Sequence, residues 1–190
     1  MSTVSNIELE DLIELSEHIE NEELRKRTQE LLEDFHLSND NFKQGRSRLE
    51  KIPCWIGGHH YYEGGLVDHI YSVTELCIKM VENFEDVYDK ELDRDSLVSA
   101  ALLHDLTKQF ILDNMEGFKE YSLDHNVWMS CELYSRGFPE KVIEIVADHG
   151  GETNEPTPRS DEARILHHAD SLDAEMNQSN ALSGVEIFGL

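Results

Sequence analysis

Histidine and aspartate residues recur along this chain at intervals that suit a metal centre. Successive positions are separated by about 20 to 35 residues, which is long enough for one helix and a connection. Imidazoles and carboxylates delivered by several helices can hold one or two divalent ions with open coordination positions, as hydrolytic metal catalysis requires. The candidate metal ligands are His69, His104, Asp105, His125, His149 and Asp170.

The dipeptide His104-Asp105 is the most informative part of this series. Adjacent side chains on a helix diverge by about 100°, so the two can approach one metal from different sides. The two oxygens of Asp105 can also bridge a second ion. Lys108, four residues after His104, is a candidate to contact a substrate phosphate. The alternative for Lys108 is a surface lysine at a helix end.

Single residues of this kind are weak evidence. A histidine is more often an ordinary polar or core residue than a ligand, and one His-Asp dipeptide arises readily by chance. The hypothesis of a metal centre therefore depends on the ordered set of positions and not on any single residue.

Composition narrows the class of protein. A chain of 190 residues fits one domain with a real core. It has 4 prolines and few runs of alternating β-branched residues, which favours an all-α fold. Its 3 cysteines are widely separated, which indicates reduced thiols rather than a disulfide framework or a zinc knuckle.

The formal net charge of −24 repels polyanions and argues against nonspecific coating of nucleic acid. A local phosphate site remains compatible with it. A basic cluster precedes His69 and is either part of such a site or a solvated helix face. Its members are Lys43, Arg46, Arg48 and Lys51. We find no basic leader and no run of about 18 apolar residues, so we expect a cytoplasmic protein without membrane contact.

Apolar residues at helical spacing predict that helix follows helix. The helices are expected, in chain order, over about 6–36 with a break near Asn21, then over 66–84, 96–108, 125–137 and 139–149, and from 161 onward. A loop over 152–160 precedes the last of these, which carries Asp170.

Three segments of the chain resemble a known family. Residues 59–69 read HHYYEGGLVDH, residues 101–108 read ALLHDLTK, and residues 148–176 contain DHGGE and LHHADSLDAEM. The ordered ligand series resembles the HD-domain metal-dependent phosphohydrolase superfamily, in the subset with extra histidines for a second metal. The three segments are similar to the HD domain of bacterial 3′-to-5′ exoribonucleases.

This resemblance implies an HD-domain helical bundle over residues 41–178. An N-terminal helical extension is expected over residues 1–40, and a C-terminal tail over 179–190. The apolar run at 185–190 is expected to pack on the domain or on another subunit.

The resemblance also implies roles for the site residues. One ion would be held by His69, His104, Asp105 and Asp170, and a second by Asp105, His125 and His149. A metal-activated water would attack phosphorus in line, with Asp105 and Lys108 as the catalytic residues and Lys108 on a phosphate oxygen. His59 and His60 would line the substrate pocket or simply pack the loop. His167 would be a ligand or a partner of one.

Two departures from the family pattern bear on the substrate. Those exoribonucleases carry an oligonucleotide-binding barrel ahead of the HD domain, whereas about 40 helical residues occupy that place here, so stable binding of long nucleic acid is not expected. Thr107 stands where the family usually has glycine, and Asp148 where a paired histidine is common. Neither change removes an expected ligand.

The expected function is therefore a divalent-metal phosphohydrolase, specifically a phosphodiesterase. It would act on a small phosphorylated substrate such as a nucleotide or cyclic phosphodiester, or on a short RNA. The alternatives are an HD-type di-iron oxygenase and a noncatalytic nucleotide or metal sensor. Mn²⁺ or Fe²⁺ is favoured, although Ni²⁺, Co²⁺ and Zn²⁺ accept the same ligands. Oligomer formation is left open.

Overall fold

The computed structural model describes residues 7–42, 45–112, 124–150 and 158–178. Over these residues it contains helices and no β-strand, so the all-α prediction is confirmed there. The helices are α1 (Leu9–Leu15), α2 (Glu22–Glu33), α3 (Gly65–Tyr88), α4 (Arg94–Leu103), α5 (Lys108–Ile111), α6 (His125–Ser135), α7 (Glu140–Asp148) and α8 (Asp161–Met176). Short 3-10 turns lie at Ser16–His18 and Leu49–Lys51.

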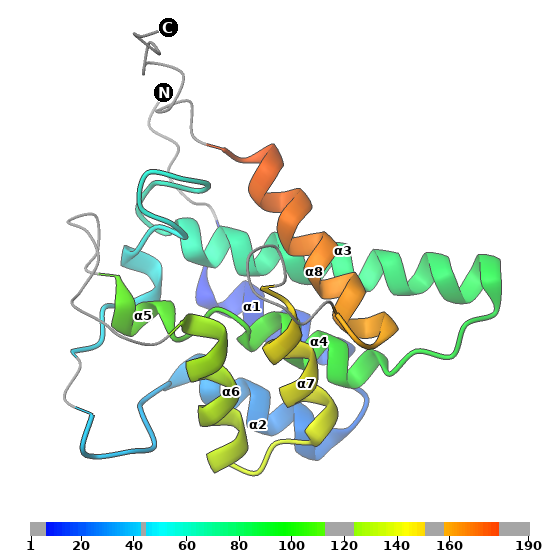
Figure 1. Ribbon diagram of the computed structural model, residues 1–190, viewed down its shortest axis with the longest axis horizontal. Helices are drawn as coiled ribbons and strands as arrows, with labels where there is room; N and C mark the ends of the chain where they lie inside the picture. Colours follow the sequence, from blue (N-terminus) through cyan, green and yellow to red (C-terminus); the bar gives the residue numbers. More distant parts are fainter. Residues whose placement is uncertain (1–6, 43–44, 113–123, 151–157, 179–190) are drawn as a thin grey trace, which may run out of the picture.

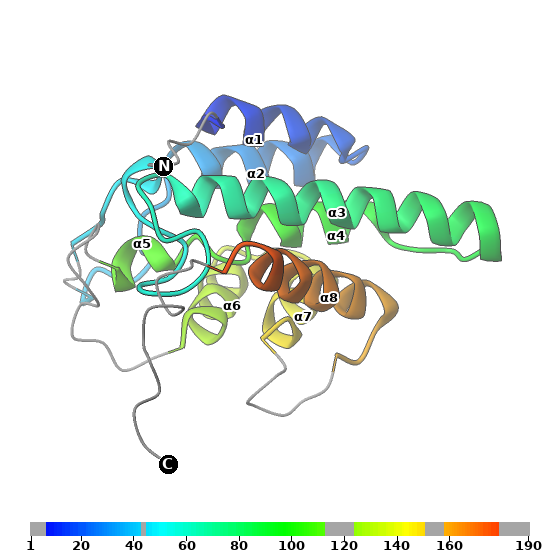
Figure 2. The same ribbon diagram turned by 90° about the horizontal axis from the view of Figure 1, so that it is seen from above.

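Helix α4 is the centre of the bundle. Every residue from Ser96 to Leu103 is buried, as expected of a helix that is apolar on all sides. It packs against α2, α3, α7 and α8. Figure 2 shows α1 and α2 on one side of the long helix α3, with α6, α7 and α8 on the other. Helix α4 is thus the element on which several other helices pack.

The N-terminal helices pack directly on the helices that carry the candidate ligands. Helix α1 contacts α3, and α2 contacts α4. Asp95 accepts hydrogen bonds from the backbone N–H groups of Glu20 and Asn21, at 2.8 and 2.9 Å. The hydroxyls of Thr28 and Ser99 lie 2.8 Å apart between α2 and α4. The division into residues 1–40 and 41–178 stays a prediction.

The helix expected over 96–108 ends earlier than its apolar pattern indicates. After Leu103 the backbone tightens into three-residue steps, in which Leu106 N–H donates to the Leu103 carbonyl at 3.2 Å and Lys108 N–H to the Asp105 carbonyl at 2.9 Å. His104 and Asp105 therefore lie at a helix end rather than within a helix. This turn directs both side chains into the space between α3, α6, α7 and α8.

None of the helices over the described ranges combines the length and hydropathy that a membrane-spanning segment requires. Most of the expected loop at 152–160 and the whole tail at 179–190 lie outside the described residues. The predicted docking of the tail therefore stays a prediction.

Candidate metal centre and active site

The six candidate ligands come from five parts of the bundle and meet in one place. His69 lies in the second turn of α3, and His104 with Asp105 directly follows α4. His125 is the first residue of α6, and His149 caps the end of α7. Asp170 lies in the middle of α8, which crosses α3 and α4 (Figure 1). The sequence-predicted set is thus assembled by the fold.

The start of α3 depends on a close backbone approach. A Cβ atom on Gly65 would lie 2.0 Å from the carbonyl oxygen of His60, a contact that no side chain could make without moving the backbone. Glycine at this position therefore lets the loop that carries His59 and His60 pack against the helix that carries His69.

The Asp105 carboxylate lies at the centre of the cluster. Its Oδ2 atom is 3.3 Å from His69 Nε2 and 3.4 Å from His104 Nε2, and its Oδ1 atom is 3.3 Å from His125 Nε2. His69 Nε2 also lies 3.1 Å from Asp170 Oδ1. Ligand atoms of two groups, His69/His104/Asp170 and His104/Asp105/His149, lie within 4.8 Å of one another. His104 is common to both groups, and the Asp105 carboxylate reaches toward His69, His104 and His125.

Several polar atoms at the centre have no hydrogen-bond partner although they are buried. Among the described residues these include His69 Nε2, His104 Nε2 and Asp105 Oδ1. The short distances from these nitrogens to carboxylate oxygens lack hydrogen-bond geometry, and an unsatisfied buried polar atom costs about 1–3 kcal/mol. A cation between the nitrogens and the carboxylates would satisfy all three atoms, so the donor set fits a divalent metal.

The opposite nitrogen of each central histidine is held by a hydrogen bond. His104 Nδ1 lies 2.7 Å from the carbonyl oxygen of Ala101, and His149 Nδ1 lies 2.6 Å from that of Val146. Because a carbonyl only accepts, each Nδ1 carries a proton, which leaves Nε2 as the atom that can bind a metal when the ring is neutral. These are the contacts that orient histidine for metal binding.

In His69 the Nδ1 atom is held by the Asp173 carboxylate instead of a backbone carbonyl. Asp173 was not singled out from the sequence. Asp173 Oδ2 accepts from His69 Nδ1 and from His60 Nε2, each at 2.7 Å, and Asn177 Nδ2 donates to Oδ1 at 3.2 Å. Burial raises the pKa of Asp173, but the hydrogen bonds from His60 and His69 outweigh it and hold the carboxyl ionised. The available signal was its position three residues after Asp170 on the same helix face.

His60 is engaged on both sides. Its Nε2 atom contacts Asp173, and its Nδ1 atom lies 2.9 Å from the hydroxyl of Tyr62, which donates to Asp68 at 2.6 Å. The ring is 5% exposed and does not line the cavity beside the cluster. This placement favours a positioning role for His60 over direct contact with substrate.

Lys108 lies beside Asp105, with Nζ 2.5 Å from Oδ2, and both side chains are buried. Burial raises the pKa of Asp105, but Lys108 and His104 lower it well below its usual value. Burial likewise lowers the pKa of Lys108, yet Asp105 raises it above its usual value. The pair therefore consists of a carboxylate and an ammonium. Cys54 Sγ lies 3.4 Å from the same Nζ atom and 3.0 Å from His59 Nε2.

Two histidines of the site are neutral imidazoles. Burial and the neighbouring His104 lower the pKa of His149 to about 4. Burial and Lys108 lower the pKa of His59 to about 3. His149 therefore has no proton to lose before it binds a metal.

A cavity of about 240 Å³ opens beside the cluster. Its lining includes Trp55, His59, Lys108, His125, His149, His167 and Asp170. His167 does not turn Nδ1 toward the cluster, because this atom lies 2.8 Å from the His149 carbonyl. The cavity gives a small substrate access to Lys108 and to three of the candidate ligands, which are His125, His149 and Asp170.

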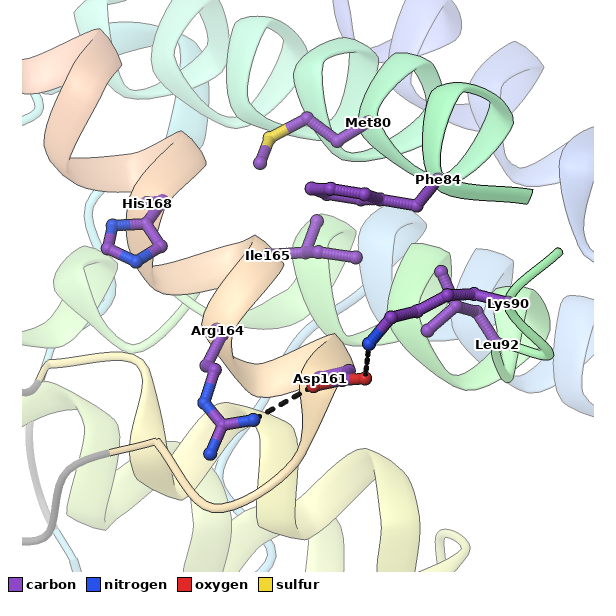
Figure 3. A pocket seen from close by; sticks show the side chains of 8 residues that line it. All are labelled: Met80, Phe84, Lys90, Leu92, Asp161, Arg164, Ile165 and His168. Atoms are coloured by element: carbon purple, nitrogen blue, oxygen red, sulfur yellow. Dashed lines mark hydrogen bonds and ion pairs between the residues drawn. The ribbon is translucent and has the colours of Figure 1, made fainter. Parts of the chain in front are cut away.

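A second cavity, of about 200 Å³, lies between α3 and the start of α8 and contains none of the candidate ligands. Figure 3 shows Met80 and Phe84 facing Ile165 across it, with Lys90 and Arg164 both paired to Asp161. Among the described residues no group of possible metal ligands lies in this second cavity, so the histidine cavity is the candidate active site.

Comparison with known proteins identifies the family. The sequence model of the HD domain matches residues 66–175. The chain is 39% identical over 174 residues to the dihydroneopterin 2′,3′-cyclic phosphate phosphodiesterase of Methanocaldococcus jannaschii, an alignment that covers 89% of this chain and 70% of that protein.

More distant relatives are longer proteins. The chain is 27% identical over 202 residues to the 3′-5′ exoribonuclease YhaM of Bacillus subtilis, covering 93% of this chain and 61% of the relative. The chain is 28% identical over 196 residues to YhaM of Bacillus velezensis, and this alignment covers 90% of this chain and 59% of the relative. No solved structure gives a significant match. The chain belongs to the HD-domain family of metal-dependent phosphohydrolases.

Proposed function

We propose that the protein is a divalent-metal phosphodiesterase that opens a small cyclic phosphodiester. One observation carries the proposal most directly: the buried His69 Nε2, His104 Nε2 and Asp105 Oδ1 atoms lack hydrogen-bond partners beside a cavity that Lys108 also lines. This pattern supports a cation at the centre and an anionic substrate in the cavity. The phosphodiesterase and exoribonuclease relatives favour hydrolysis over the oxygenase and sensor alternatives.

The proposed ligands divide around Asp105. His69, His104, Asp105 and Asp170 would hold one ion, and Asp105, His125 and His149 a second. Such ions, when bound, lower the pKa of coordinated water and neutralise charge on the phosphoryl group. Mn²⁺ and Fe²⁺ suit this mixture of imidazole and carboxylate ligands, although related divalent ions accept it too.

The chain's own groups would orient the ester. Lys108 carries its charge at the cavity wall, next to Asp105, where an ammonium can bind a phosphate oxygen and stabilise charge that develops there. His149 and His125 border the same cavity. A substrate phosphate bound at Lys108 would thus lie against the proposed second group of ligands. Hydrolysis breaks one P–O bond, and the departing oxygen becomes a hydroxyl of the monophosphate product.

The substrate class rests on the relatives and on charge. The relative from Methanocaldococcus jannaschii is named for dihydroneopterin 2′,3′-cyclic phosphate, so we propose this ester and nucleoside 2′,3′-cyclic phosphates as the first candidates. Short RNA is a weaker candidate, because the exoribonuclease relatives are longer and a net charge of −24 disfavours long polyanions.

The test uses metal-stripped protein with and without Mn²⁺. The substrates are both cyclic esters, bis(p-nitrophenyl) phosphate, p-nitrophenyl phosphate and a short RNA, with Asp105→Ala assayed in parallel. We expect metal-stimulated cleavage of at least one cyclic diester and its loss in Asp105→Ala. If Mn²⁺ stimulates the cleavage of none of these esters, the proposal is refuted.

A further inference from the structure

One aromatic side chain, that of Trp55, forms part of the wall of the histidine cavity, the cavity of about 240 Å³ beside the candidate ligands. Trp55 is 39% exposed and lines the same cavity as Lys108, His125 and Asp170. An indole ring binds no divalent cation of the kind expected here, so the metal centre itself does not account for this residue. Its exposed surface offers an apolar, planar face to whatever enters the cavity.

The loop around Trp55 is held in place from both sides. The preceding residue, Cys54, is fully buried, and its N–H donates to the His60 carbonyl at 3.2 Å. On the other side, a Cβ atom on Gly58 would lie 2.8 Å from Trp55 Cδ1, so only glycine there lets the ring lie this close to the backbone. The indole is thus positioned before any ligand arrives, which reduces the entropy cost of binding.

Trp55 is also close to the proposed phosphate site. The Lys108 Nζ atom lies 5.6 Å from the centroid of its ring. A phosphate held by Lys108 therefore brings the organic part of the ester next to the indole. Only a ligand with an aromatic group near its phosphate can use both residues at once.

We infer that Trp55 is a specificity-determining residue, which stacks on a planar heteroaromatic ring joined through a short linker to the scissile phosphate. The inference rests on the proposed phosphodiesterase function. It concerns the part of the substrate that the metal centre does not contact. Aromatic stacking tolerates different ring systems, so purine and pterin rings both fit this role.

The test compares substrates that share the cyclic phosphate but differ in the ring. Kinetics of the Mn²⁺-loaded protein are measured with 2′,3′-cyclic AMP, dihydroneopterin 2′,3′-cyclic phosphate and glycerol 1,2-cyclic phosphate. The variants are Trp55→Ala, Trp55→Leu and Trp55→Phe. Tyr134→Ala is the control, since Tyr134 is 78% exposed on α6 and does not line the cavity.

We expect Trp55→Ala and Trp55→Leu to lower kcat/KM for the ring-bearing esters by roughly 5- to 150-fold, mainly through KM. Glycerol 1,2-cyclic phosphate should be affected by no more than about twofold, Trp55→Phe should retain most of the activity, and Tyr134→Ala should behave like the parent. An equal loss on all three esters, or no loss on any, would overturn the inference.

Binding separates this inference from the proposed function. If the parent protein cleaves none of the esters, the proposed function fails, but calorimetry with adenosine 3′-monophosphate and glycerol 3-phosphate still decides the role of Trp55. Preferential binding of the adenosine ligand that is lost in Trp55→Ala supports stacking. Equal affinity of the two ligands contradicts it.

Discussion

The ammonium of Lys108 lies 2.5 Å from Asp105 Oδ2, and both residues are almost completely buried. The bond compensates the charge of the buried Asp105 carboxylate. A divalent cation at Asp105 would bring a second compensating charge. Lys108 would then be available to a phosphate oxygen without leaving the cavity wall.

Replacing Lys108 tests this relationship. We expect Lys108→Met to lower kcat by about 10²- to 10³-fold, because one positioned charge on the phosphoryl group is lost. Metal affinity should not fall, since the substitution removes a cation that competes for Asp105. Steady-state kinetics and calorimetric Mn²⁺ titration measure the two effects. The control is Lys141→Met, which removes an ion pair to Glu162 away from the histidine cavity and should leave kcat unchanged.

Asp173 should control metal binding without touching the metal. Asp173→Asn removes the negative charge from the acceptor shared by His69 Nδ1 and His60 Nε2, so the bonds that orient the His69 ring weaken. We expect metal affinity to weaken about 10- to 100-fold, measured by competition with a chelator.

The matched control for this change lies on the same helix. Asp161→Asn makes the same chemical substitution at the second cavity (Figure 3), where Asp161 pairs with Lys90 and Arg164. It should leave metal affinity unaltered. If both variants bind metal like the parent, Asp173 does not position His69.

Removal of metal should destabilise the fold. Without a cation, Asp105, Asp170 and Asp173 surround His69. At a free metal concentration of 100 times Kd the bound ion adds about 2.7 kcal/mol, which for a chain of this size corresponds to a change in Tm of roughly 5–10 °C. Thermal unfolding with Mn²⁺ and with excess chelator measures the difference. An unchanged Tm, in a sample shown to bind Mn²⁺, would contradict a buried metal centre.

The Glu162 contact predicts a pH dependence of stability away from the metal centre. Glu162 accepts from the Asp93 N–H at 3.0 Å and pairs with Lys141 at 2.8 Å. Burial raises its pKa, but the bond from Lys141 and the backbone bond from Asp93 lower it below the usual value. A lowered folded-state pKa means that the stabilisation is present above the unfolded-state pKa and is lost as the pH falls through the folded-state pKa.

We therefore expect Glu162→Gln to cost about 1 kcal/mol at pH 7. The difference from the parent should stay constant down to about pH 5 and shrink below about pH 4. Urea unfolding of both proteins across this range measures it. A difference that grows as the pH falls would have the wrong sign.

The sequence predicted the helices well, because helices depend on local pattern, and the same pattern placed the candidate ligands in order along the chain; their role as ligands stays a prediction. The apolar stripe of α3 and the apolar run of α4 specify buried helices, and all the candidate ligands except Asp170, which lies within α8, are at or near a helix end. That the six side chains meet around Asp105 follows from packing, which the pattern alone cannot show.

Some features were missed. The end of α4 at Leu103, where local turn hydrogen bonds replace the helical ones, was expected only at about residue 108. The other missed features depend on tertiary contacts. Asp173 gains its role only where α8 meets the start of α3. Trp55 was not singled out from the sequence, and Cys54 was expected only to be a reduced thiol; their positions near Lys108 depend on how the loop packs.

One measurement tests the central claim most directly. Metal-stripped protein is titrated with Mn²⁺ while bound metal and hydrolysis of dihydroneopterin 2′,3′-cyclic phosphate and 2′,3′-cyclic AMP are followed in the same samples. The account predicts no hydrolysis without metal and a rate that saturates at one or two bound ions per chain. In Asp105→Ala both the metal affinity and the rate of hydrolysis should be lower than in the parent. Stoichiometric metal binding without cleavage of either ester, or cleavage that persists after complete metal removal, would contradict it.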